Sequence, residues 1–118
     1  MRIELPRDET RVAQLREKLA EYKKRRELYE AHGNQMAVVN VRMKIAILEL
    51  LLEYGWVETD TIREQFQGEL GADFDPRHFA NASETIQDYC RTGGANVFGG
   101  TGLPPICTQP QREKPEVV

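Results

Sequence analysis

Few side chains in this sequence have the type and spacing that catalysis or metal binding requires. The candidates are Cys90, Cys107, His32 and His78, and no two of them have the short spacing, about two to five residues, of zinc ligands. Cys90 and His78 are twelve residues apart on one predicted helix. At about 1.5 Å per residue this separation is about 18 Å, too far for a nucleophile and its base. The sequence therefore predicts no enzyme, no metal site and no cofactor.

Two other local patterns have simple structural explanations. Asp73 and Asp75 form a carboxylate pair, but Asp75 precedes Pro76 and is explained as the N-cap of a helix. The glycines within residues 99–102 lack the following Lys-Ser/Thr, and they lack the strand and helix that flank a phosphate-binding loop. A turn explains them without a ligand, so neither pattern predicts a site.

Composition and charge limit the classes of function. The chain has 118 residues, of which 40% are hydrophobic and 30% charged, with a formal net charge of −3. This length predicts one domain. Residues 1–30 hold nine Lys/Arg and seven Asp/Glu, whereas the remainder holds seven and twelve. The acidic remainder argues against non-specific nucleic-acid binding, which depends on Lys/Arg displacing counterions from phosphates.

The sequence predicts a cytoplasmic protein without a membrane partner. The longest apolar runs, Met36–Val39 and Ile45–Leu48, are far shorter than a membrane span, which needs about 20 residues. The first six residues contain a carboxylate and lack the apolar stretch of a secretory signal. Two cysteines do not form a disulfide framework, so a reducing compartment is expected.

The elements that must position any functional residue begin with a helix over residues 8–31. Asp8 is its expected N-cap, and Gly33 suits the left-handed position that ends it. Glu21 precedes Arg25 by four residues and is expected to pair with it. A narrow apolar seam follows one face of the helix: Val12, Leu15, Leu19 and Tyr22. The seam predicts that residues 1–34 serve in dimerisation or docking.

A second helix is predicted over residues 35–54, ended by Gly55. Its polar residues fall on one narrow stripe, and most of the remaining circumference is apolar. The stripe consists of Gln35, Arg42, Glu49 and Glu53. A helix that is apolar on most sides is covered by several neighbours, so this helix is expected at the centre of the fold.

Shorter elements are expected after Gly55. Trp56 and Val57 form an extended segment, and a helix over residues 62–70 is capped by Thr59 or by Thr61. A last helix follows Asp75, and its expected buried residues are Phe79, Ala82, Ile86 and Tyr89. Beyond it the sequence predicts an irregular hairpin over residues 96–108, built around the glycine-rich turn, and a disordered tail over residues 109–118.

This order of elements resembles the winged helix-turn-helix family. The stretch from Ile47 to Ile62 contains a core helix ending in glycine, a short apolar strand and a capped short helix. The resemblance covers about residues 36–108 and is shared by many regulators. It implies a mainly α, winged-helix-like bundle with a small C-terminal β-hairpin, and the long N-terminal helix predicted from the periodicity precedes this bundle. The corresponding domains are residues 1–34, 35–108 and 109–118.

The resemblance also implies a function, that of a dimeric DNA-binding transcriptional regulator. The helix over residues 76–91 would enter the major groove, and two such helices would lie about 34 Å apart on DNA. Its expected solvent-facing residues are Arg77, His78, Asn81, Ser83, Thr85, Gln87 and Arg91. Arg77, His78, Asn81 and Thr85 are the implied DNA contacts, because Arg and Asn side chains read base edges. Lys23 and Lys24 are either phosphate contacts or part of an ordinary solvated helix face.

A second hypothesis is a protein-interaction module on the same helical fold, an adaptor or inhibitor of a larger protein that does not bind DNA. Glu84 and Asp88 lie four residues apart on the helix implied to bind DNA and would repel phosphates. The acidic remainder of the chain and the apolar seam would then contact the larger protein. The expected partners are thus double-stranded DNA or a larger protein, together with a second copy of the chain.

Overall fold

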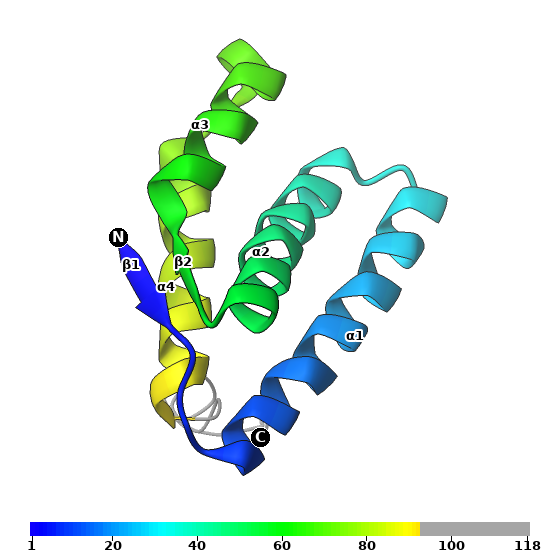
Figure 1. Cartoon of the computed structure of the whole chain (residues 1–118). Coiled ribbons are helices and arrows are strands. Elements are labelled where there is room, and N and C mark those ends of the chain that lie inside the picture. Colours follow the sequence, from blue (N-terminus) through cyan, green and yellow to red (C-terminus); the bar gives the residue numbers. More distant parts are fainter. Residues whose placement is uncertain (93–118) are drawn as a thin grey trace, which may run out of the picture. The chain divides into compact units, whose positions relative to one another are not determined.

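The computed structural model of the chain describes residues 1–92, which are mainly helical with one small two-stranded antiparallel sheet. The elements, labelled in Figure 1, are β1 (Arg2–Glu4), α1 (Glu9–Ala31), α2 (Gln35–Tyr54), β2 (Trp56–Glu58), α3 (Thr59–Leu70), the 3-10 turn η1 (Gly71–Asp73) and α4 (Pro76–Thr92). Residues 1–87 form one compact unit, and a second unit begins at Asp88. The predicted hairpin over residues 96–108 and the tail over residues 109–118 lie outside the described residues.

The helical hairpin of α1 and α2 has the predicted bounds, because local signals define them. Asp8 caps α1, its carboxylate accepting a hydrogen bond of 2.9 Å from the backbone N–H of Thr10. Asn34 caps α2 by accepting from Ala37, and Gly55 ends it with a φ of 82°. Few residues other than glycine adopt that φ without strain. The two helices lie side by side (Figure 1).

Helix α2 is central, as its composition predicts. Residues on several sides of it are buried: Val38, Val41, Met43, Ile45, Ile47, Leu48 and Leu51. The other elements of the unit also contribute buried apolar residues: Ile3, Leu15, Tyr22, Val57, Ile62, Phe66, Phe79, Ala82 and Ile86. Removal of this apolar surface from water stabilises the arrangement by about 25 cal/mol for each Å² buried.

The two-stranded sheet involves a strand that the sequence did not predict. Strand β1 pairs antiparallel with β2, with Ile3 opposite Val57, and both of these side chains are buried. The three-residue strand has no local signature, because its stability comes from pairing with residues more than fifty positions away. Through this sheet and α1, the segment 1–34 belongs to the same compact unit as residues 35–87.

The start of α3 differs from the prediction. The helix begins at Thr59, and its N-cap is Glu58, whose carboxylate accepts from the backbone N–H of Asp60. Thr59 and Thr61 are therefore not the cap. The Thr59 hydroxyl instead donates to the carbonyl oxygen of Met1 at 3.0 Å, because the β1–β2 pairing brings that carbonyl close.

Helix α4 begins as predicted, with the Asp75 carboxylate accepting from the backbone N–H of Arg77 at 2.9 Å. The four residues expected on its buried face, Phe79, Ala82, Ile86 and Tyr89, are all buried.

Among the helices of residues 1–92, none combines the length and the apolar character that crossing a bilayer requires.

Candidate protein-binding groove

Two of the four predicted DNA contacts on α4, Arg77 and His78, lie at its amino end beside the Asp75 carboxylate. Arg77 and Asn81 are exposed, one helical turn apart, whereas His78 and Thr85 are half-buried. The Asp75 carboxylate lies 3.5 Å from Nε of Arg77 and 3.7 Å from Nε2 of His78. The hydrogen bond from the Arg77 backbone N–H, aided by the Arg77 and His78 side chains, lowers the pKa of Asp75. A carboxylate therefore occupies the position that a phosphate would take at this helix terminus.

Ser83 does not belong to the solvent face on which the sequence places it. Its side chain is 3% exposed, and within residues 1–92 its Oγ has no hydrogen-bond partner. The reason is its spacing from the apolar residues Phe79, Ala82 and Ile86. Ser83 lies four residues after the first and three before the last, so it shares their buried face.

The basic run on α1 is largely paired with carboxylates. Nζ of Lys23 lies 3.1 Å from Glu49 on α2, and Arg25 and Arg26 pair with Glu21 and Glu30 on their own helix. Lys24 is exposed. Along residues 59–92, seven Asp/Glu face three Lys/Arg, so α3 and α4 add negative charge to the surface. The residues implied to contact DNA are thus split between two helices and lie among carboxylates.

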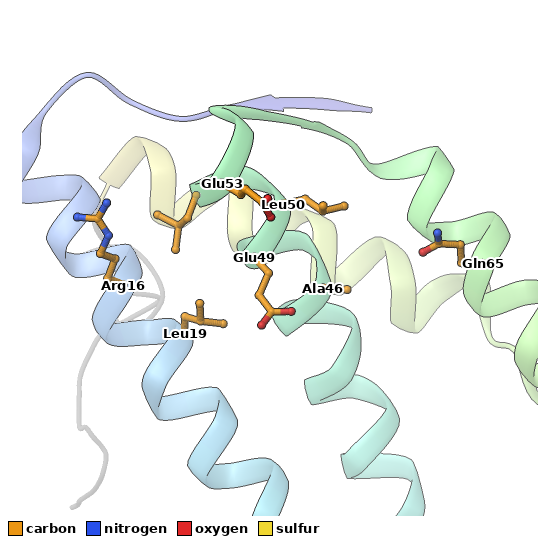
Figure 2. Close-up of a pocket in the computed structure, with 8 residues that line it drawn as sticks. Arg16, Leu19, Ala46, Glu49, Leu50, Glu53 and Gln65 are labelled. Atoms are coloured by element: carbon orange, nitrogen blue, oxygen red, sulfur yellow. The ribbon is translucent and has the colours of Figure 1, made fainter.

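A groove lined by residues of α1, α2 and α3 follows α2, and we call it the α2 groove (Figure 2). Its larger part has a volume of about 770 Å³ and is open to solvent. The lining residues are Arg16 and Leu19 from α1, Ala46, Glu49, Leu50, Leu52 and Glu53 from α2, and Gln65 from α3. A second hollow of about 250 Å³ shares Ala46, Glu49 and Gln65 and extends the groove to Arg26, Arg42, Ile45, Phe66 and Glu69.

The groove follows the polar stripe predicted on α2. Arg42, Glu49 and Glu53 of that stripe all line it, because the stripe is the face that α1 and α3 leave open. Leucines flank this stripe: Leu19, Leu50 and Leu52 are half-buried and give the groove an apolar floor. The sequence contains a signal for this face, the polar stripe itself. The sequence contains no signal that Arg16 and Gln65 lie beside this face, because these residues come from other helices.

An ion pair between α2 and α3 borders the end of the groove that contains Arg42. The Arg42 guanidinium makes two hydrogen bonds to the Glu69 carboxylate, at 2.7 and 2.8 Å, and lies 5.2 Å from the centre of the Phe66 ring. These hydrogen bonds raise the pKa of Arg42 and lower the pKa of Glu69. At the opposite end, Arg16 and Glu53 are exposed, and neither has an ion pair within the described part of the chain.

The apolar seam predicted on α1 is partly covered by the chain itself. Leu15 and Tyr22 are buried, with 1% and 2% of their surface exposed. Val12 and Leu19 are half-buried, and Leu19 contributes to the α2 groove. A second copy would therefore reach only half of the seam. Self-association through it stays a prediction.

Across residues 1–92, no three His, Cys, Asp or Glu side chains gather closely enough to hold a metal ion. Cys90 is buried, and Cys107 lies outside the described residues. No family model, curated protein or solved structure matches the chain.

Proposed function

We propose that this protein is a protein-interaction module, an adaptor or inhibitor that binds a larger protein through the α2 groove. The observation that carries the proposal is the open apolar floor formed by Leu19, Leu50 and Leu52 between charged borders. Covering such leucines stabilises a complex through removal of apolar surface from water. The charged borders supply orientation and specificity.

The shape of the groove favours a helical ligand. It follows one helix and is bordered by two others, which is the arrangement in which an amphipathic helix of a partner inserts between neighbours. The charge distribution also supports a protein ligand over DNA. Lys23, Arg77 and His78 each lie beside a carboxylate of the chain, and phosphate binding would have to displace these contacts.

A second candidate function is DNA binding by a winged-helix-like dimer in the cytoplasm. One observation favours it: Arg77 and Asn81 are exposed, one turn apart, at the amino end of α4. The order α2, β2, α3 and α4 also agrees with the helix–strand–helix–helix order of the winged-helix family. In this proposal Arg77 and Asn81 read bases, and Lys24 contacts phosphate.

Co-purification from an extract of the source organism, with and without nuclease, tests the proposed function. Gln65→Trp fills the α2 groove from α3. Gln67→Trp is its matched control, because Gln67 is also exposed on α3 but lines neither hollow. We expect one bound protein that persists after nuclease treatment. We expect Gln65→Trp to abolish its binding, and Gln67→Trp and Arg77→Ala to retain it.

The opposite pattern would favour the second candidate. Binding would then disappear with nuclease and be insensitive to Gln65→Trp. Arg77→Ala would weaken retardation of a preferred DNA fragment by about 1–3 kcal/mol, or roughly 5- to 150-fold. Loss of partner binding in both tryptophan variants alike would show that the α2 groove is not the contact site.

A further inference from the structure

The two unpaired charges at one end of the α2 groove indicate what kind of helix binds there. Arg16 on α1 and Glu53 on α2 both line the groove, and neither has an ion pair in the described part of the chain (Figure 2). The other charged residues that line the groove are paired, as Glu49 is with Lys23 and Arg42 is with Glu69. One cation and one carboxylate are therefore available to a ligand.

We propose that the occupant of the α2 groove is an amphipathic helix of a partner protein that places a carboxylate against Arg16 and a cation against Glu53. Its apolar seam covers Leu19, Leu50 and Leu52. This inference rests on the proposed function and specifies the ligand of the same groove. A like charge opposite Arg16 or Glu53 would be repelled. These two residues therefore select the charges of the bound helix and fix its orientation and register.

The length of the groove determines the length of the bound helix. From Arg42 to Glu53 the groove follows twelve residues of α2, a rise of about 16 Å at 1.5 Å per residue, or about three turns. At the Arg42 end, Arg42 is already satisfied by Glu69. The charges of the bound helix are therefore recognised at the end of the groove that contains Arg16. At the end that contains Arg42, only the shape of the bound helix is recognised.

A second copy of the chain does not fit this description. The exposed large apolar residues of residues 1–92 are scattered over different elements: Met1, Leu28, Met36, Tyr54 and Trp56. No described helix presents three turns of exposed apolar seam that could enter the groove of another copy. No helix within residues 1–92 thus matches the groove, and the proposed occupant is a helix of a different protein.

Selection from a phage-displayed library of 14-residue helical peptides, with the full chain as target, tests the proposal. The comparison target is the exchanged variant Arg16→Glu/Glu53→Arg, which keeps the net charge and alters only exposed side chains. Circular dichroism and thermal melting confirm that it folds. We expect peptides with apolar residues at i, i+3, i+4 and i+7, flanked by an acid on one side and a base on the other.

On the exchanged variant, the two flanking charges of the selected peptides should exchange signs. Peptides selected on the wild type should lose at least about tenfold in affinity for the exchanged variant, because two attractive charge pairs become repulsive. They should regain that affinity when their own two charges are exchanged. Anisotropy of the labelled peptides measures both changes. Gln65→Trp should abolish binding of all the selected peptides, and Gln67→Trp should leave their binding unchanged.

Three results would overturn the inference. Selected peptides that bind both targets equally would show that Arg16 and Glu53 do not read the ligand. Failure to enrich any helical peptide would exclude a helix as the occupant. A wild-type dimer that Gln65→Trp converts to a monomer would make a second copy the occupant. If co-purification still depends on Gln65 in the first two cases, the proposed function stands and only the ligand assignment fails.

Discussion

Leu51→Ala is expected to lower the free energy of unfolding by about 2–5 kcal/mol, the range for a fully buried leucine. Leu51 is 0% exposed and lies on the central helix α2. The truncation removes apolar contacts and leaves a cavity that the surrounding helices cannot fill by small movements. For a domain whose total stability is about 5–15 kcal/mol, this is a large fraction, and Tm should decrease by roughly 10–20 °C.

Met36→Ala is the matched control for this prediction. It removes a similarly long side chain from the same helix, but Met36 is 65% exposed, so the free energy of unfolding should change by no more than about 0.5 kcal/mol. Urea titration followed by circular dichroism measures both variants. Equal effects of the two substitutions would show that α2 is not central, and the position of the α2 groove on it would have to be abandoned.

Leu15→Asp is expected to prevent folding at 25 °C. Leu15 is 1% exposed, and an aspartate there would bury a carboxylate in an apolar environment, at a cost of several kcal/mol beyond the loss of apolar burial. Leu19→Asp, one turn further along α1, should give a folded protein because Leu19 is half-buried at the open groove. Far-ultraviolet circular dichroism distinguishes the two.

This pair also separates packing within the chain from self-association. A folded Leu15→Asp monomer obtained from a wild-type dimer would place Leu15 at a subunit interface and contradict its burial within one chain. Leu19→Asp is the variant suited to test the homodimer that the α1 seam predicts. Light scattering of that variant, compared with the wild type, measures the effect directly.

Local signals explain why much of the fold could be predicted from the sequence. The bounds of α2 follow from Asn34 and Gly55, whose capping and left-handed conformations depend on neighbouring residues alone. The Glu21–Arg25 pair, at 2.8 Å, likewise follows from spacing on one helix. The predicted burial of the apolar face of α4 also holds, because a 3-4 periodicity is a local property.

The candidate site could not be predicted in the same way, since it depends on contacts between distant segments. The Arg42–Glu69 pair joins residues 27 positions apart, and Lys23–Glu49 joins two helices. Strand β1 has no stability without β2. The polar stripe of α2 marked the open face, but only the placement of α1 and α3 beside it makes that face a groove. The residue types on α4 indicated DNA contacts. Asp75 was predicted as the N-cap of this helix, but its ion pairs with the Arg77 and His78 side chains were not predicted.

The central claim is that the α2 groove binds a protein. Site-specific photo-crosslinking in living cells of the source organism tests this claim most directly. A benzophenone amino acid replaces Leu50, which lines the groove, or Met36, which is exposed on the same helix outside it. We predict that irradiation joins position 50, and not position 36, to one protein partner, and that Gln65→Trp removes this product. Absence of a protein adduct at position 50, or equal adducts at both positions, would contradict the claim.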